Sequence, residues 1–310
     1  MKRRKFIELA ALSGTAITSG FKSFNNDVDS KSKFKSPWPI CLNTSTIRPA
    51  TLEQKINAAS KAGYDGVEIW INELEEYEKN GGSLIELGKQ ILEKNLYVPN
   101  IIGLWDCMPM DEKDFKNSLP ATKERMRRSS DVGSRYVAAI PAPDREDINY
   151  QTILKRYSEL LKIGKEEYGL IVAFEFVGFF KGIYQFGHAA GVALDTNNSD
   201  ACLIMDTFHL FRGNSGFNNI SKINGNLIAN FHINDVSDKT PREEQGDKDR
   251  IYPGDGILPL VQLIKDLKKI NYKGALSLEM FNREHWEKEP YEVAKTGIEK
   301  IKRIIQLAEV

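Results

Sequence analysis

Eight short runs rich in β-branched and aromatic residues alternate with amphipathic segments of helical period from Ile40 onward. This alternation is typical of βα units built around a parallel sheet. We expect the strands at Ile40–Thr46, Gly66–Trp70, Tyr97–Gly103, Tyr136–Ala142, Ile171–Gly178, Cys202–Phe208, Ile228–Asp235 and Ala275–Phe281. We expect the helices at Leu52–Ala62, Ser83–Lys94, Glu112–Val132, Tyr150–Tyr168, Tyr184–Leu194, Asn218–Asn224, Leu260–Ile270 and Glu292–Leu307.

A helix after each of eight strands favours a closed (β/α)8 TIM barrel over an open, doubly wound sheet. The first strand is not followed by a glycine-rich nucleotide-binding motif, which argues further against the open sheet. Four residues, Gly63, Asn95, Gly133 and Gly169, stand where helices should end in the left-handed conformation. The long polar loop Val236–Gly256 is expected at the C-terminal face of the barrel, where active sites are built.

The N-terminus differs from the rest of the chain. Its charged start contains the pair Arg3-Arg4, and a mildly apolar stretch follows. This pattern predicts a twin-arginine export signal at 1–24, a polar linker at 25–38 and a single catalytic domain at 39–310. We therefore expect a periplasmic protein, with an uncleaved cytoplasmic tail as the alternative. The apolar stretch is too short and too weak to predict stable insertion into a membrane.

The charge balance restricts the partners. The chain has 43 Lys and Arg against 43 Asp and Glu, a formal net charge of +0 at pH 7. No basic block recurs after the N-terminus, so a nucleic-acid partner lacks an electrostatic footprint. We expect a small-molecule ligand, and the sequence leaves homo-oligomer formation open.

Four successive strands, the fifth to the eighth, each carry one metal-ligand side chain near the C-terminal end. These are Glu175, Asp206, His232 and Glu279, and a closed barrel would bring them to one mouth. Three uncompensated carboxylates there would repel one another unless a cation neutralised them. We therefore predict one divalent metal ion. The oxygen-rich ligand set favours Mn²⁺, and Mg²⁺, Co²⁺ and Zn²⁺ are also compatible.

Such a site indicates a reaction. A divalent ion that chelates a carbonyl and its neighbouring hydroxyl acidifies the α-proton, because it stabilises the developing enediolate. Glu175 or Glu279 could then move that proton by general acid-base catalysis. Glu68 points into the barrel by strand alternation, and it is expected to support the metal ligands or bind substrate, with a buried ion pair as the alternative. Asn43 and Trp70 end the first two strands, where they could line the substrate pocket.

Several stretches carry a family resemblance. "FEFVG", "MDTFH", "FHINDVSD", "DRIYPGDGILPL" and "LSLEMF" closely resemble the xylose-isomerase-like TIM-barrel sugar phosphate isomerase/epimerase superfamily, in particular its inosose isomerase branch. The resemblance runs from about Ile40 to the C-terminus. It implies a metal-dependent isomerase or epimerase of a carbohydrate or cyclitol, with the metal held by the four residues above. It also implies that His209 and Arg250 grip substrate oxygens.

Other functions stay open beside this one. Ketose 3-epimerases of the superfamily carry a second acid shortly after the strand-five glutamate, where this chain has "GFFKG", so epimerisation of that type is disfavoured. An export signal is unusual for inositol catabolism. A rival is therefore a 3-keto-glycoside lyase or hydratase, in which the same proton abstraction expels the group at the β-carbon. An endonuclease-like metallohydrolase and a non-catalytic sugar-binding barrel are weaker alternatives, the first because the chain has only 4 histidines.

Overall fold

The computed structural model describes residues 35–141 and 145–310. The predicted export signal at 1–24 and the first ten residues of the predicted linker lie outside the described residues. Residues Ser36–Val310 form one compact unit. Trp38, placed by the prediction at the end of the linker, is buried, and its indole Nε1 donates a hydrogen bond to the Tyr272 carbonyl at 3.0 Å. The packed domain therefore already includes the end of the range predicted as linker.

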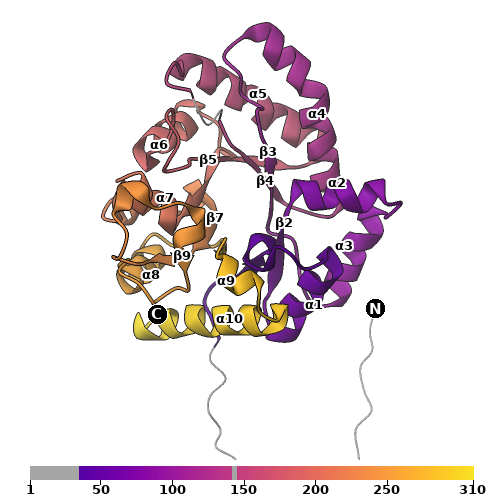
Figure 1. Ribbon diagram of the computed structural model, residues 1–310. Coiled ribbons are helices and arrows are strands. Elements are labelled where there is room, and N and C mark those ends of the chain that lie inside the picture. Colours follow the sequence, from indigo (N-terminus) through magenta and orange to yellow (C-terminus); the bar gives the residue numbers. More distant parts are fainter. Residues whose placement is uncertain (1–34, 142–144) are drawn as a thin grey trace, which may run out of the picture. The chain divides into compact units, whose positions relative to one another are not determined.

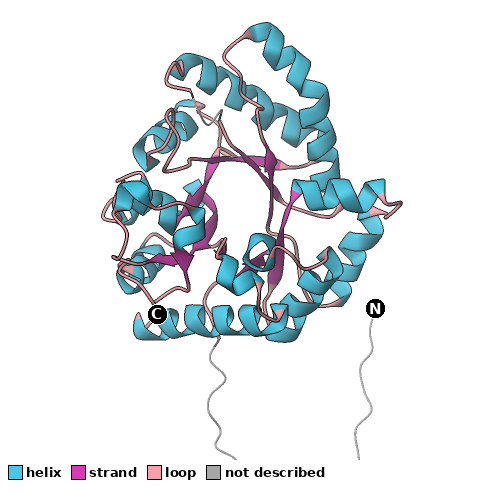
Figure 2. Cartoon of the chain, viewed as in Figure 1, coloured by secondary structure: helices cyan, strands magenta, loops and turns pink. Residues whose placement is uncertain are grey.

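Eight parallel strands close into a barrel, as predicted (Figure 1). β1 pairs with both β2 and β10, which closes the ring. Figure 2 shows the strands as an inner ring with the helices outside it. The barrel strands are β1 (Ile40–Asn43), β2 (Gly66–Trp70), β3 (Asn100–Leu104), β4 (Tyr136–Ala139), β5 (Ile171–Glu175), β6 (Cys202–Asp206), β7 (Ile228–Ile233) and β10 (Ala275–Leu278).

The helices surround the strands and end at the residues expected to stop them. Gly63, Asn95, Gly133 and Gly169 all have positive φ, which confirms their prediction as left-handed caps. The helices are α1 (Leu52–Ala62), α2 (Ile71–Lys79), α3 (Leu84–Glu93), α4 (Glu112–Asp131), α5 (Tyr150–Tyr168), α6 (Phe186–Asp195), α7 (Thr207–Arg212), α8 (Leu260–Lys269), α9 (Arg283–Trp286) and α10 (Pro290–Leu307). None of the helices in the described ranges is both long enough and apolar enough to cross a membrane.

Six of the eight strands, β1, β4, β5, β6, β7 and β10, end earlier than predicted, and at two of these ends a side chain turns the chain. Asn43 ends β1, since its Oδ1 accepts a hydrogen bond from the Ser45 N–H at 3.0 Å and starts the 3-10 helix η1 (Thr44–Ile47). Asp206 likewise ends β6 and starts α7. The helix predicted over 218–224 is wrong, because only a 3-10 turn, η2 (Ile220–Lys222), forms there.

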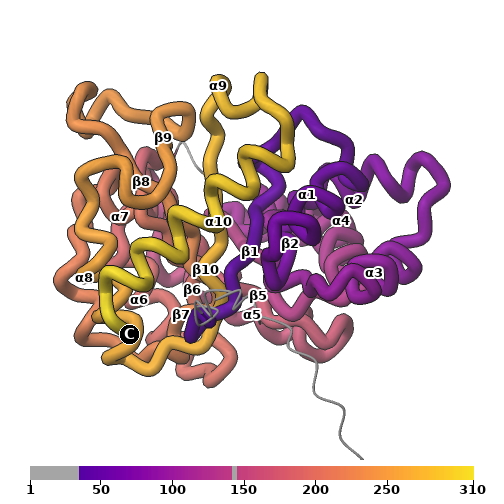
Figure 3. Tube along the Cα trace, turned by 90° about the horizontal axis from the view of Figure 1, so that it is seen from below, coloured from indigo at the N-terminus to yellow at the C-terminus, as the bar shows by residue number. Residues whose placement is uncertain are grey.

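The polar loop after β7 is an ordered structure at one end of the barrel. β8 (Asp235–Val236) pairs antiparallel with β9 (Arg250–Ile251), and the 3-10 turns η4 (Arg242–Glu244) and η5 (Asp247–Asp249) lie between them. The Asp235 carboxylate accepts hydrogen bonds from the N–H groups of Gly254, Gly256 and Leu258. Figure 3 shows β9 and α9 at the same end of the molecule. Because β9 begins at Arg250, this loop positions that side chain.

Candidate functional site

Asp206 ends β6 and begins α7 with the same side chain. Its Oδ1 accepts hydrogen bonds from the N–H groups of Phe208 at 2.6 Å and His209 at 3.4 Å, so Asp206 is the N-cap of α7. A carboxylate suits this position because it pairs with free N–H groups at the positive end of the helix. Its Oδ2 makes separate contacts with charged groups of the site. Asp206 and His209 are three residues apart, so the carboxylate lies at the end of β6 and the imidazole in the first turn of α7.

Three of the four residues predicted to bind a metal, Asp206, His232 and Glu279, form one compact group, and Glu175 lies beside it. One ligand atom each from Asp206, His232 and Glu279 lie within 4.8 Å of one another. His232 Nδ1 is 3.1 Å from Glu279 Oε2, 3.7 Å from Asp206 Oδ2 and 3.6 Å from Glu175 Oε1. The barrel register produces this convergence, because His232 pairs with Asp206 on one neighbouring strand and with Ser277 on the other. All four side chains are buried.

Arg250 supplies positive charge that the sequence argument did not foresee. Its Nη1 donates to Asp206 Oδ2 and to Glu279 Oε2, both at 2.7 Å. The guanidinium is itself buried, with its Cζ 4.8 Å from the ring centre of Phe208 and 5.0 Å from that of Phe281. The carboxylates are therefore not uncompensated, and charge balance alone does not require a metal here. The prediction that these carboxylates are uncompensated is therefore wrong.

Burial and charge act in opposite directions on the pKa values of this cluster. Burial raises the pKa of Glu175 well above its usual value. Burial also disfavours ionised Asp206, but the charge of Arg250, together with the charges that His209 and His232 carry when protonated, outweighs it and holds the pKa of Asp206 well below its usual value. Burial lowers the pKa of His209 to about 4 despite the opposing charge of Asp206. His209 is therefore neutral at neutral pH.

Glu68 lies on the other side of His232 and orients its ring. The Glu68 side chain is fully buried, and burial would raise its pKa, but the charge and hydrogen bond of His232 lower it on balance. An ionised carboxylate only accepts hydrogen bonds, so Nε2 of His232 carries a proton and Nδ1 faces the other acids. The Glu68 contacts are Asn100 Nδ2 at 2.8 Å, Asn230 Nδ2 at 2.8 Å, His232 Nε2 at 2.9 Å, Asn43 Nδ2 at 3.0 Å and Ser277 Oγ at 2.5 Å.

The cluster contains atoms that a metal ion would satisfy. Glu175 Oε2 and His232 Nδ1 are buried and have no hydrogen-bond partner among residues 35–141 and 145–310. Buried polar atoms without partners are costly, and in native proteins they call for an explanation such as a bound ion. Three carboxylates and one imidazole nitrogen form a donor set that divalent cations accept. The residues present therefore fit a divalent metal.

A cavity of about 240 Å³, which we call the mouth cavity, is lined by Glu175 and Glu279 of this cluster but not by Asp206 or His232. Among the residues expected to contact substrate, Trp70, His209 and Arg250 line it, as do both proposed catalytic residues, Glu175 and Glu279. Asn43 and Glu68 do not line it, and both are fully buried. Their polar atoms are used in hydrogen bonds, including one from Asn43 Nδ2 to Glu279 Oε1 at 3.1 Å. The structure therefore gives these two residues a supporting position rather than a substrate-facing one.

Several residues that line the mouth cavity were not predicted as site residues, among them Asp247, Trp105 and Phe281. Asp247 Oδ1 accepts a hydrogen bond from Arg250 Nη2 at 2.6 Å. Its position in a loop with many charges gave no reason to select it. Trp105 stacks on Trp70 with ring centres 5.6 Å apart. Trp105 directly follows β3, and Phe281 ends the predicted eighth strand. An aromatic residue at the end of a strand more often marks packing.

Comparison with known proteins places the chain among related barrels. A family model described as xylose isomerase-like TIM barrel matches residues 56–304. An inosose isomerase of Bacillus velezensis is 27% identical over 272 residues, which cover 86% of this chain and 96% of that protein. A 3-dehydroshikimate dehydratase of Pseudomonas putida is 20% identical over 233 residues, which cover 75% of this chain but only 36% of that protein.

A solved structure, that of the IOLI protein with a binding zinc atom, superposes with a TM-score of 0.79 and 26% sequence identity. The match covers 87% of this chain and 99% of that one. The likeness thus extends over nearly the whole of the other chain.

Proposed function

This chain belongs to the xylose isomerase-like TIM-barrel family, and we propose that it is a metal-dependent isomerase of a keto-sugar or keto-inositol. The observation that carries the proposal is the buried cluster of Asp206, His232 and Glu279 beside Glu175, facing the mouth cavity. The similarity to inosose isomerases over most of the chain supports the same class of substrate.

We propose that Glu175, Asp206, His232 and Glu279 hold one divalent ion. The oxygen-rich donor set favours Mn²⁺, and the zinc of the similar IOLI protein makes Zn²⁺ the main competitor. When bound, the ion supplies Lewis-acid polarisation of the substrate ketone, which acidifies the neighbouring C–H group. Metal analysis of the purified protein tests this assignment, and protein that holds no divalent ion after incubation with Mn²⁺ and Zn²⁺ would refute it.

The side chains themselves supply the proton transfer and the orientation. Glu175 lines the mouth cavity and has two carboxylate oxygens, so one oxygen can hold the ion while the other takes the α-proton and returns it to the adjacent carbon. The hydroxyl proton moves between the two substrate oxygens, which leaves the product an isomer of the substrate. Neutral His209 and cationic Arg250 line the cavity and can hold those oxygens, while aromatic side chains exclude water.

The test is isotope exchange. The metal-loaded protein is incubated in deuterated water with inosose and with a 3-keto-glucoside, and proton loss at the carbons next to the ketone is followed by NMR. We expect exchange with at least one compound, lost in Glu175→Gln and retained in Glu86→Gln, which changes an exposed glutamate of α3. Absence of exchange with both compounds would refute the proton transfer.

A second candidate, a lyase acting on a 3-keto-glycoside, is favoured by the match to a 3-dehydroshikimate dehydratase. Elimination begins with the same removal of an α-proton, and it then breaks the bond between the β-carbon and its leaving group. The two outcomes differ in product mass, which is conserved in isomerisation and not in elimination. Mass spectrometry of the exchange reactions therefore separates them.

We also propose export through the twin-arginine route, on the support of the Arg3-Arg4 pattern in the sequence. Replacing both arginines by lysine should leave the full-length protein in the cytoplasmic fraction of the producing cell. Equal periplasmic amounts of the variant and the unchanged protein would contradict this route.

A further inference from the structure

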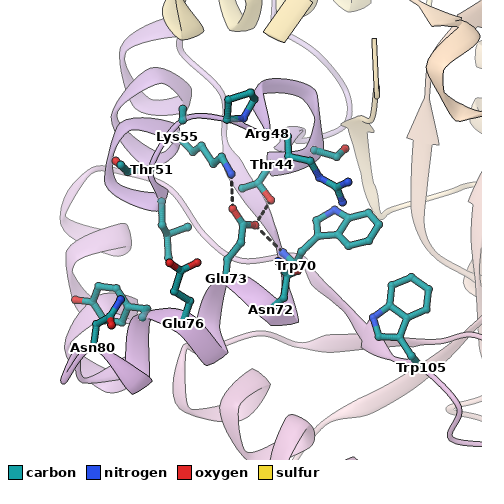
Figure 4. A pocket seen from close by; sticks show the side chains of 15 residues that line it. Thr44, Arg48, Thr51, Lys55, Trp70, Asn72, Glu73, Glu76, Asn80 and Trp105 are labelled. Atoms are coloured by element: carbon teal, nitrogen blue, oxygen red, sulfur yellow. Dashed lines mark hydrogen bonds and ion pairs between the residues drawn. The ribbon is translucent and has the colours of Figure 1, made fainter. Parts of the chain in front are cut away.

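A second and larger cavity, which we call the outer cavity, lies beside the mouth cavity. It has a volume of about 910 Å³, against about 240 Å³ for the mouth cavity, and Trp70 and Trp105 line both. Pockets that hold small molecules typically measure about 300–1,000 Å³, so the mouth cavity alone is smaller than usual. Figure 4 shows the two tryptophans at one end of the outer cavity and Glu76 and Asn80 at the other. The site as a whole therefore offers room for more than one ring.

An ion pair between buried Lys55 and half-buried Glu73 lines the outer cavity. Lys55 of α1 donates from Nζ to Glu73 Oε1 of α2 at 2.5 Å, with side-chain exposures of 5% and 13%. The other oxygen of Glu73 accepts from Thr44 Oγ1 and from the Trp70 N–H, the latter at 3.1 Å. Figure 4 shows these bonds converging on Glu73. A buried pair is expensive to desolvate and adds little net stability, so its satisfied geometry makes a fixed polar surface rather than a simple stabilising contact.

The wall between the two cavities is connected to the catalytic cluster. Trp70 Nε1 donates to Asn43 Oδ1 at 2.9 Å, and Asn43 Nδ2 donates to Glu279 Oε1 at 3.1 Å. Arg48 covers the other face of this wall, with its Cζ 5.0 Å from the Trp70 ring centre and 5.4 Å from that of Phe281. Cation–π contact holds this guanidinium at the edge of the outer cavity, where its N–H groups can reach a ligand. A molecule that occupies both cavities would therefore contact Trp70, which a hydrogen bond to Asn43 and the Arg48 guanidinium hold in place.

The charges and shape of the outer cavity indicate the chemistry of its ligand. Arg48 and Lys55 are balanced by Glu73 and Glu76, so the lining carries no net charge that would select a phosphate or a carboxylate. Aromatic faces together with a few fixed polar groups suit a neutral, polyhydroxylated ring. We propose that the outer cavity is a second carbohydrate subsite, which holds a sugar ring joined by a glycosidic bond to the ketone-bearing ring in the mouth cavity. This inference rests on the proposed function and selects its keto-sugar branch over the keto-inositol, with a keto-glycoside of at least two rings as the substrate class.

The experiment compares two probes on the full, Mn²⁺-loaded chain. One is methyl 3-keto-β-glucoside, with one ring, and the other is 3-keto-cellobiose with the ketone in its non-reducing ring. Calorimetry gives the Kd of each, and NMR in deuterated water gives exchange next to the ketone. We expect the two-ring probe to bind about tenfold more tightly, as one added hydrogen bond to a charged group predicts. Arg48→Ala and Glu76→Ala should each bring the ratio of the two Kd values toward one.

The matched control is Arg135→Ala. Arg135 lies directly before β4, at the opposite end of the strands, and its Cζ is 5.2 Å from the Tyr136 ring centre, so it has a cation–π contact like that of Arg48. It should leave the Kd ratio unchanged. Equal Kd values for the two probes in the unchanged protein, or a ratio preserved in both cavity variants, would overturn the subsite. If deuterium exchange occurs but the two probes have equal Kd values, the subsite alone is contradicted. If the Kd values differ tenfold but no exchange occurs, the proposed reaction is contradicted and the subsite is supported.

Discussion

Replacing Glu68 by glutamine tests the support beneath the catalytic cluster. The substitution keeps the size of the side chain but removes its charge and turns one acceptor into a donor. Glu68 Oε1 faces three donors and Oε2 faces two, those of Asn43 and Ser277. The new amide nitrogen should therefore take the Oε2 position, where the Ser277 hydroxyl can rotate to accept its proton. The Nδ2 of Asn43 would then face another donor.

The cost follows from these contacts. One buried donor without an acceptor costs about 1–3 kcal/mol, and losing the charged partner of His232 costs about 1.5–3 kcal/mol. Together they predict a loss of about 3–5 kcal/mol in the free energy of unfolding, close to that for breaking a buried ion pair. The pKa of Glu68 is lowered in the folded protein, so the stability that it contributes is present above its unfolded pKa and is lost as the pH falls. The measurement therefore belongs near pH 7.

Urea denaturation in the presence of EDTA measures the stability, and titration with Mn²⁺ measures the metal affinity. We expect Glu68→Gln to weaken metal binding about 10–100-fold, as the loss of a carboxylate behind a ligating histidine does elsewhere. Glu86→Gln is the control, because its exposed carboxylate pairs with Lys89 only at the surface and should change stability by less than about 0.5 kcal/mol. A loss below about 1 kcal/mol with unchanged metal affinity would show that Glu68 does not support His232 and the metal site.

Three further changes test other parts of the structure. Asp206→Asn should lower metal affinity at least about tenfold, whereas His209→Asn should keep the metal and weaken inosose binding by about tenfold. Calorimetry with the metal and with inosose measures both affinities. Loss of metal from both variants would contradict separate roles for Asp206 in metal binding and His209 in substrate binding. The pKa of His209 is lowered to about 4 in the folded chain. Between about pH 6.5 and 4, His209 is therefore protonated in the unfolded protein but not in the folded protein. The unchanged protein in EDTA should therefore lose about 3 kcal/mol relative to His209→Gln as the pH falls from about 6.5 to 4, and parallel pH profiles from urea denaturation would count against it. Gly256→Ala would place a Cβ against the Val236 carbonyl oxygen, so it should lower the free energy of unfolding, measured by urea denaturation, by about 1–3 kcal/mol. Gly187→Ala is the control, because no atom lies within 4 Å of the added carbon, and it should not lower the free energy of unfolding.

The alternation of strands and helices predicted the barrel because every parallel strand needs a helix to return the chain. Strand ends were predicted less well, since apolar residues continue past the point where the backbone leaves the sheet. At Asn43 and Asp206 a side chain caps the next turn and ends the strand early. The same cap created α7 directly after β6, where the sequence favoured a helix further on. Local hydrogen bonding decided these boundaries, and hydrophobic periodicity does not report it.

The convergence of Glu175, Asp206, His232 and Glu279 could be predicted because all four lie near the C-terminal ends of parallel strands. The pairing of Arg250 with two of them could not, because a side chain on a long loop can reach many places. Glu68 was predicted to point inward, but its five hydrogen-bond partners come from β1, β3, β7 and β10. Only the closed register brings those strands together around one carboxylate.

Arg250 and His232 lie beside the carboxylates of the cluster. Positive charge is already present, so repulsion among carboxylates no longer demands an ion. What remains is unsatisfied bonding capacity, at Glu175 Oε2 and at the Nδ1 that Glu68 turns toward the cluster. Nearby acids raise the pKa of His232 well above its usual value although burial opposes it, so an incoming ion must displace the Nδ1 proton. Metal affinity should therefore fall with decreasing pH, and the ion and the proton are alternative ways to complete the same buried site.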